Sequence, residues 1–294
     1  MAIYSELFGQ HLRLGNFLFE FAANLKLSLV HNTQAVYPDW YYLWKYLENP
    51  PFTYTKEPMY GEIIRPMAWG WTQEEEDYIN GLDYSKDVIF ALNHFRQSSK
   101  WFEGYEKEVI NSLKAKNEIY IKLFGKYKNF FTEKPTIGIG IRLGDFKNHG
   151  TFFQISHSWY IKALEAEFPN WRENYTVVVF SDDIPEAKGI FKKYPFQYAD
   201  PNETHTHKDN FKYYHGDASE QFFLGTMMDN FIIGNSTFSW WQAFLATWKQ
   251  GSYYPQNINK GKVVHCGEVF HPKGNHKHCD ISNYYHSSWK LVKI

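Results

Sequence analysis

The chain has 294 residues, of which 44% are hydrophobic and 21% are charged, and its formal net charge is −1. This hydrophobic content excludes a disordered protein, and the length favours two domains. A dedicated nucleic-acid-binding protein is not expected either, because such proteins usually present a basic surface.

The sequence also indicates where the protein resides. Its two cysteines, Cys266 and Cys279, form no disulfide framework, so a reducing compartment is expected. The N-terminus has no signal-peptide pattern, and no apolar run approaches the roughly 20 residues of a membrane span. We expect a cytoplasmic protein, either free or peripherally associated with a membrane.

The first half of the chain predicts two helices separated by an irregular region. Residues 12–29 open with a glycine-containing turn and continue as a helix, because Leu18, Phe21, Ala22 and Leu25 recur at three-and-four spacing. Residues 32–81 are interrupted by prolines and predict irregular structure with short elements. A polar, lysine-rich helix is expected over residues 102–127.

Short apolar strands and helices alternate in the second half. Strands are expected at 136–141, 176–180 and 230–234, and helices at 158–167, 184–194, 219–229 and 239–248. This alternation predicts an α/β fold with a parallel sheet. Ligands bind such sheets at the carboxyl ends of the strands. Arg142, Asp182 and Asn235 each follow a strand directly, so a site is expected at this edge.

The loop at 142–145 (RLGD) suits phosphate binding. The Arg142 guanidinium can donate two parallel hydrogen bonds, and the glycine permits close approach. The alternative is an ordinary ion pair of Arg142 with Asp145 or a surface glutamate. Gly138 and Gly140 lie inside the strand and do not form a dinucleotide-binding fingerprint. They are expected to let a ligand or a neighbouring element approach the strand.

Two further loops carry polar groups. Asp182 and Asp183 are adjacent at a strand end and point to different sides, so they do not form a natural metal chelate. One of them is expected to accept hydrogen bonds from a ribose or base, and the other to fix the loop; helix capping is the alternative. At 235–241 (NSTFSWW), helix-start amides with Ser236 and Thr237 can hold anionic oxygens without a cation, although capping competes.

Four blocks resemble the GDP-fucose-dependent α-1,2-fucosyltransferases of glycosyltransferase family 11. Residues 12–16 (LRLGN), followed by Phe19 and Ala22-Ala23, resemble the opening R-L-G-N-Q-x-F-x-Y-A-A of the family. Residues 139–146 resemble its V-H-I-R-R-G-D-Y, and residues 180–184 its F-S-D-D-I. Residues 229–241 (DNFIIGNSTFSWW) resemble its C-D-x-x-I-I-A-N-S-S-F-S-W-W. The chain is thereby identified as a divergent member.

The divergence falls on individual positions within these blocks. The family's histidine falls on Gly140, its second arginine on Leu143, and the glutamine of the first block on Phe17. The glycine after the paired tryptophans falls on Gln242. Arg142 is retained.

The resemblance implies a GT-B fold, in which two Rossmann-like domains face a cleft and the N-terminal one is irregular. Residues 1–130 would form the acceptor-side domain, and residues 131–294 the GDP-fucose-binding domain with a histidine-rich tail. L-fucose would pass from GDP-β-L-fucose with inversion, without a cofactor or metal, to a sugar hydroxyl such as the 2-OH of galactose. The acceptor would be an oligosaccharide or glycolipid.

The resemblance also implies roles for individual residues. Arg142 would stabilise the departing diphosphate, and Asp145 is the first candidate for the base, with His149 and His157 next. Further donor contacts would come from two groups of residues, namely Arg13, Gly15 and Asn16 in the first block, and Asp182, Asp183, Glu220, Asn235, Ser236, Thr237 and Ser239 in the later blocks.

Three alternatives remain open. The chain is a catalytically silent sugar- or nucleotide-binding module, or it transfers another GDP-sugar or forms another linkage. Independently, the tail could bind zinc through its histidines and cysteines (His265, Cys266, His271, His276, His278 and Cys279), although the usual ligand spacings are missing.

Overall fold

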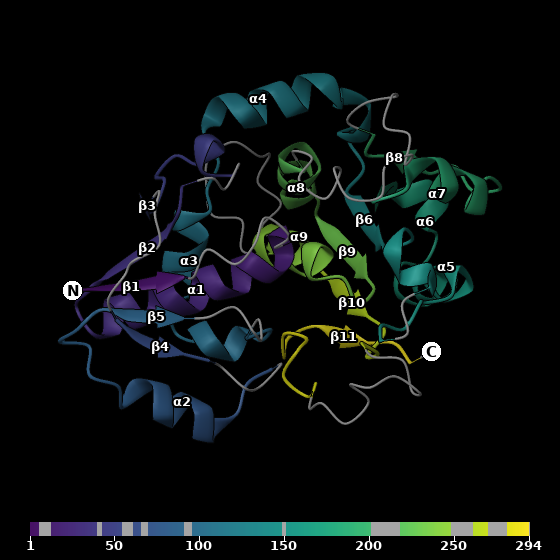
Figure 1. The fold of residues 1–294 in the computed structure, drawn as a ribbon. Coiled ribbons are helices and arrows are strands. Elements are labelled where there is room, and N and C mark those ends of the chain that lie inside the picture. Colours follow the sequence, from purple (N-terminus) through teal and green to yellow (C-terminus); the bar gives the residue numbers. More distant parts are fainter. Residues whose placement is uncertain are drawn as a thin grey trace. The chain divides into compact units, whose positions relative to one another are not determined.

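The computed structural model describes residues 1–5, 13–39, 43–54, 61–65, 70–90, 96–148, 151–200, 218–247, 261–269 and 281–293, except the side chains of Asp145 and Asn148. The chain divides into two compact units (Figure 1). Among the described residues, the first unit comprises Met1–Asn117 and residues 281–287. The second comprises residues 118–200, 218–247, 261–269 and 288–293.

The first unit contains a five-stranded parallel sheet with the strand order β3-β2-β1-β5-β4. Its strands are β1 (Ala2–Ser5), β2 (Gln34–Pro38), β3 (Phe52–Tyr54), β4 (Glu62–Ile64) and β5 (Val88–Phe90). None of these strands is predicted from the sequence. Strands of three to five residues are too short to show a periodic pattern, and the edge strands β3 and β4 are mostly exposed.

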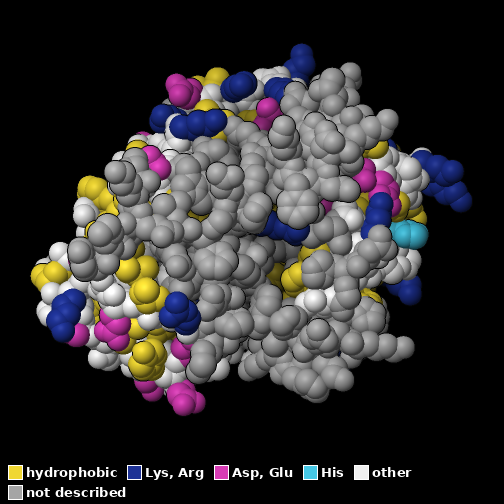
Figure 2. All heavy atoms as spheres, in the orientation of Figure 1, with side chains coloured by type: hydrophobic (Ala, Val, Ile, Leu, Met, Phe, Trp, Pro, Cys, Tyr) yellow, Lys and Arg dark blue, Asp and Glu magenta, His cyan; other side chains and the backbone are white. Residues whose placement is uncertain are grey.

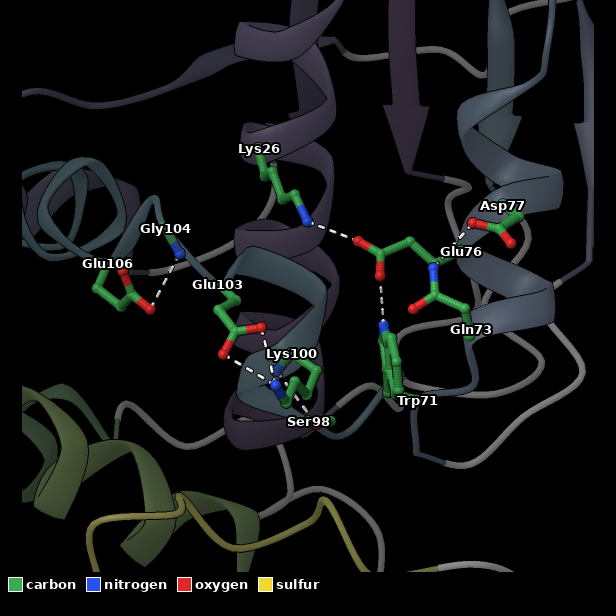
Figure 3. A network of polar contacts seen from close by, with 10 residues as sticks. All are labelled: Lys26, Trp71, Gln73, Glu76, Asp77, Ser98, Lys100, Glu103, Gly104 and Glu106. Atoms are coloured by element: carbon green, nitrogen blue, oxygen red, sulfur yellow. Dashed lines mark hydrogen bonds and ion pairs between the residues drawn. The ribbon is translucent and has the colours of Figure 1, made fainter.

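Helix α1 (Leu14–Val30) packs against this sheet and confirms the first predicted helix. Gly15 lies in its first turn, so the expected glycine-containing turn before the helix is wrong. Leu18, Phe21 and Ala22 are buried as the spacing predicts. Helix α2 (Gln73–Asn80) is joined to α1 by an ion pair of Lys26 and Glu76, 2.7 Å apart (Figure 3).

The single helix predicted over 102–127 is wrong. The chain forms η2 (Ser99–Phe102), α3 (Glu106–Ser112), α4 (Asn117–Lys126) and η3 (Lys128–Phe130) instead. Between α3 and α4, Ala115 forms an antiparallel bridge with Leu47, which follows η1 (Trp44–Tyr46). The amide of Lys116 donates to the carbonyl of Tyr46. The backbone here therefore bonds with a distant segment, and a continuous helix is interrupted.

The second unit contains a six-stranded parallel sheet with the order β11-β10-β9-β6-β7-β8. Its strands are β6 (Thr136–Ile141), β7 (Thr176–Ser181), β8 (Gln197–Tyr198), β9 (Asn230–Ile233), β10 (Val263–His265) and β11 (Lys290–Leu291). The three predicted strands are confirmed as β6, β7 and β9. Two parallel sheets in one chain also confirm the α/β class.

The predicted helices of the second unit are confirmed with shifted ends. They are α5 (His157–Glu167), α7 (Ile184–Ile190), α8 (Ser219–Thr226) and α9 (Thr237–Thr247), to which the structure adds α6 (Trp171–Asn174) and η4 (Asp145–Asn148). Trp240 and Trp241 on α9 are fully buried, so they belong to the core.

No helix within the described ranges has the length and apolar character needed to span a bilayer. On the face shown in Figure 2, basic and acidic side chains of the described residues are interspersed, and neither sign dominates. This mixture matches the near-zero net charge of the chain.

Candidate functional site

Three polar loops meet at the carboxyl edge of the second sheet. Strand β6 lies between β7 and β9, with Ile141 opposite Ser181 and Gly140 opposite Ile233. Arg142, Asp182 and Asn235 follow these three neighbouring strands within two residues. The structure therefore brings these residues to one edge, as the strand pattern predicts.

Arg142 is held by the loop after the neighbouring strand. Its Nε lies 3.2 Å from Oδ2 of Asp182, and both side chains are 18% exposed. The guanidinium carbon lies 5.9 Å from the centre of the Phe146 ring. The contact observed for Arg142 is thus an ion pair with another residue of the same sheet edge. The side chain of Asp145, one of the partners considered from sequence, is not among the described side chains.

The Asp182 carboxylate also organises the RLGD loop. Its two oxygens accept hydrogen bonds from the amides of Leu143, at 2.9 Å, and Gly144, at 3.0 Å. A Cβ on Gly144 would lie 2.6 Å from Oδ2 of Asp182, so only glycine permits this closeness. Asp182 thus fixes both the backbone of the loop and the side chain of Arg142.

Asp183 serves the following helix. Its Oδ1 accepts from the Glu186 amide at 3.0 Å and caps α7, while its own amide donates to the Ser181 hydroxyl at 3.0 Å. Helix capping, the alternative considered from sequence, is therefore the contact observed for Asp183. Both acids are tied into protein structure, and they face different partners, as expected for adjacent residues.

The start of α9 approaches strand β6 very closely. A Cβ on Gly140 would lie 2.2 Å from the Ser239 hydroxyl, and one on Gly138 would meet the Phe231 ring at 2.4 Å. The strand glycines therefore admit neighbouring elements, α9 and β9. Ser239 is buried at this contact, whereas Ser236 and Thr237 are half-buried at the helix start.

Asn235 and Glu220 bond to protein groups. The side-chain Nδ2 of Asn235 donates to the backbone carbonyls of Phe153, at 2.8 Å, and Val269, at 2.9 Å. Asn235 thereby joins two neighbouring loops. Glu220, in the first turn of α8, accepts from the hydroxyl of Tyr127 at 2.6 Å and from Lys126 at 2.6 Å. Burial, followed by this hydrogen bond, raises the pKa of Tyr127.

The remaining predicted residues belong to other elements or fall outside the described part of the chain. Arg13, Gly15 and Asn16 stand at the start of α1 in the first unit, and Gln97 Nε2 donates to Asn16 Oδ1 at 3.2 Å. His157 is exposed at the start of α5. The Asp145 side chain and all of His149 fall outside the described residues.

The proposed metal ligands of the tail are only partly described. Cys266 is buried and its thiol donates to the carbonyl of Glu268 at 3.3 Å, and burial lowers the pKa of His265 to about 4. His271, His276, His278 and Cys279 lie outside the described residues. Within the described part of the chain, no group of three potential ligands is clustered.

Comparison with known proteins identifies the family. Residues 102–262, more than half of the chain, match the model of glycosyl transferase family 11. The chain belongs to this family. The matched range contains Arg142, Asp182, Glu220 and the start of α9, so the family 11 region includes the sheet edge described above.

A curated relative is the O-antigen biosynthesis glycosyltransferase WbnK of Escherichia coli, which is 29% identical over 131 residues. The alignment covers 42% of the family 11 chain and 39% of WbnK, so the chain spans about two fifths of the length of that relative.

Two solved structures share the fold of the family 11 chain. The NodZ α-1,6-fucosyltransferase of Bradyrhizobium, co-crystallised with GDP, superposes with a TM-score of 0.54 at 13% identity, covering 84% of this chain and 92% of NodZ. A variant of Arabidopsis thaliana FUT1 in complex with GDP gives 0.55 at 12% identity, covering 95% and 72%. The fold is thus of the GT-B type, with two parallel-sheet units.

Several residues around these positions are not predicted from the sequence, namely Tyr127, Gln97 and the buried pair Glu20–Arg96. Their contacts join residues 76 to 93 positions apart, and no local pattern encodes such contacts. One signal was present, because Asn16, Glu20 and Asn24 recur every four residues on an otherwise apolar helix.

Proposed function

We propose that this family 11 protein transfers L-fucose from GDP-β-L-fucose to a sugar hydroxyl, with inversion and without a divalent metal. The observation that carries the proposal is the Arg142 guanidinium, fixed by Asp182 at the carboxyl edge of the sheet. The fold shared with GDP-bound fucosyltransferase structures supports the choice of donor.

The chemistry follows from where charge develops. The bond between fucose C1 and the β-phosphate oxygen breaks as the acceptor oxygen attacks C1 from the opposite face, and GDP departs with the bonding electrons. Negative charge therefore grows on the β-phosphate, where preorganised donors are most effective. The Nε of Arg142 lies 3.2 Å from Oδ2 of Asp182. A guanidinium has five N–H donors, and in this proposal those of the terminal nitrogens face the diphosphate.

The start of α9 would supplement Arg142. Its first backbone amides and the half-buried Ser236 and Thr237 stand at the same edge, and helix-start amides bind anionic oxygens. The acceptor hydroxyl must lose a proton as it attacks. Asp145 is our first candidate for this base, with His149 and His157 next, and base catalysis contributes about 10²-fold or more.

We further propose that residues 131–294 hold the donor and residues 1–130 the acceptor side, with Arg13, Gly15 and Asn16 adding donor contacts. The proposed acceptor is a galactose of an oligosaccharide or glycolipid, attacked through its 2-OH. A cytoplasmic location, free or at a membrane surface, suits such an acceptor.

One observation favours a second candidate. Gly140 stands where the family motif has histidine, and the Ser239 side chain fills the space that a side chain there would need. Leu143, in place of the motif's second arginine, is 2% exposed and apolar. The strand β6 and the loop after it thus lack two polar groups of the family motif. A silent nucleotide- or sugar-binding module, or a transferase of another GDP-sugar or linkage, would explain their absence.

One assay separates these candidates. Purified protein is incubated with GDP-fucose, EDTA and a panel of galactose-terminated acceptors, and the products are analysed for linkage and anomeric configuration. Formation of an α-fucoside in the presence of EDTA is expected. GDP binding without transfer or donor hydrolysis would support the silent module instead, and activity that disappears with EDTA would contradict the metal-independent mechanism.

A further inference from the structure

The buried side of α1 carries a stripe of polar side chains. Asn16, Glu20 and Asn24 are four residues apart and therefore lie on one face of the helix. Glu20 and Asn24 are fully buried, whereas Asn16, nearest the helix start, is half-buried. Polar groups in this setting need partners, and all three find theirs outside the helix.

Arg96 is the partner of the two deeper residues. Its Nε donates to Glu20 Oε2 at 3.0 Å, and its Nη2 donates to the same oxygen and to Asn24 Oδ1, the latter at 2.5 Å. Asn24 in turn donates to the hydroxyl of Ser5, the last residue of β1, at 2.8 Å. Arg96 is fully buried and lies over the Phe90 ring at 4.4 Å.

Gln97, the next residue, contacts the third member of the stripe. Its Nε2 donates to Asn16 Oδ1 at 3.2 Å, and the residue is only 5% exposed. Gln97 is therefore a buried hydrogen-bond donor to the carboxamide oxygen of Asn16. The first block of the family motif has a glutamine beside this asparagine, but Phe17 occupies that position here and packs against Trp44.

The backbone around Gln97 is tightly fixed. Arg96 adopts a left-handed conformation with φ of 41°, which is costly for a residue other than glycine and persists only where the surroundings impose it. Ser98 Oγ donates to the carbonyl of Asn283 at 2.7 Å and accepts from the Lys100 amide, so that it caps η2 (Figure 3). Gln97 thus stands between two anchored residues.

We propose that Gln97 is a positioning residue: it holds the carboxamide of Asn16 so that the Asn16 NH2 group donates to the diphosphate of the sugar donor. The inference rests on the proposed function, in which Asn16 contacts GDP-fucose. A carboxamide can present either its oxygen or its NH2 group, and an anion is bound only by the NH2 end. By donating to Oδ1, Gln97 selects the orientation in which the NH2 group points away from Gln97.

A buried ion pair such as Glu20–Arg96 is weak evidence for stabilisation, because desolvation offsets much of the attraction. Its directional bonds nevertheless fix the place of the segment that carries Gln97. Gln97 itself is not needed to neutralise a buried charge. Its effect on stability and its effect on donor binding can therefore be measured separately.

The test is a double-mutant cycle on GDP affinity, measured by isothermal titration with GDP as the ligand. Gln97→Ala and Asn16→Ala are each expected to weaken GDP binding about tenfold, the usual effect of one hydrogen bond to a charged group. If Gln97 acts through Asn16, the double variant binds no more weakly than Asn16→Ala alone. Multiplying effects, of about a hundredfold, would overturn the inference, as would normal affinity in Gln97→Ala.

Two further variants sharpen the cycle. Gln97→Glu keeps the shape but cannot donate, so Asn16 would turn its NH2 group toward residue 97 and GDP affinity would fall by more than tenfold. Gln73→Ala is the matched control, because Gln73 bonds to Asp77 on the exposed side of its own helix (Figure 3), and it should leave the affinity unchanged. Thermal melting confirms that each variant is folded, and Gln97→Glu replaces Gln97→Ala in the cycle if the latter is not.

The outcomes for the wild-type protein separate the two claims. If it fails to bind GDP, the proposed function falls and this inference falls with it. If it binds GDP and transfers fucose while the cycle is additive, only the role of Gln97 is overturned.

Discussion

Two charged pairs in this protein have opposite surroundings. Arg142 and Asp182 stand at a sheet edge, and each side chain is 18% exposed. The loops that carry them directly follow two neighbouring strands, β6 and β7. Glu20 and Arg96 are fully buried, and they join residues 76 positions apart. Partial exposure leaves a guanidinium able to meet a ligand, whereas full burial commits it to the fold. We therefore expect the first pair to govern activity and the second to govern stability.

The largest expected effect breaks the buried pair. Glu20→Leu leaves the Arg96 guanidinium without its carboxylate, and loss of one partner of a buried pair costs about 3–5 kcal/mol. Urea unfolding of this variant should show that loss in the free energy of unfolding. The matched double variant Glu20→Leu/Arg96→Met removes both charges and should recover most of it. A single variant as stable as wild type would show that the pair is not buried as described.

The next effect concerns the sheet-edge pair, Arg142 and Asp182. Arg142→Ala should lower kcat by about 10²–10³, and Arg142→Lys should fail similarly because an ammonium cannot reproduce the planar fork. The free energy of unfolding should change less than in the Glu20 variant, because this pair is partly exposed to water. Arg172→Ala, in which the lost guanidinium lies over the Trp171 ring, is the matched control and should retain activity. Near-normal turnover in Arg142→Ala would refute the proposed role.

His265, the last residue of β10, lies at the same sheet edge but is buried, unlike the partly exposed Arg142 and Asp182. Burial lowers its pKa from 6.5 to about 4. Below pH 6.5 this histidine is protonated in the unfolded state but stays neutral in the folded state. The free energy of unfolding therefore falls as the pH drops toward 4, by up to about 3 kcal/mol. His265→Gln should lose this component, which unfolding measured from pH 7 to 4 would show. Identical pH profiles for both proteins would contradict it.

The smallest effect targets the loop glycine. A methyl group on Gly144 would displace the Asp182 carboxylate, so Gly144→Ala should loosen Arg142 and lower kcat about tenfold, the equivalent of roughly 1.4 kcal/mol. Gly189→Ala in α7 is the control, since a Cβ there meets nothing within 4 Å, and it should leave kcat unchanged. Equal activity of both variants would show that the Asp182 contact does not position the arginine.

The two regions also differ in how far the sequence predicts them. Strands β6 and β7 are runs of six residues with the polar loops directly behind them, so contiguous residues encode both the sheet and its edge. The strands of the first unit are shorter, prolines lie within or close to β2, β3 and β4, and the pairing of the strands depends on distant segments. Gln97 and Arg96 reach α1 across more than 70 residues, which no local pattern records. For these contacts, the local signal in the sequence is the four-residue recurrence of Asn16, Glu20 and Asn24.

That recurrence fixes the rotation of α1 about its own axis and its position along the sheet of the first unit. A helix packed only through hydrocarbon can roll about its axis or slide by a turn of 5.4 Å at modest cost, because one aliphatic contact replaces another. Here a slide by one turn would set Asn24 or Asn16 where Glu20 stands and deprive Arg96 of its carboxylate. The helix consequently has one stable position on its sheet. Arg13, Gly15 and Asn16, at the start of the helix, are therefore held at a fixed place in the first unit.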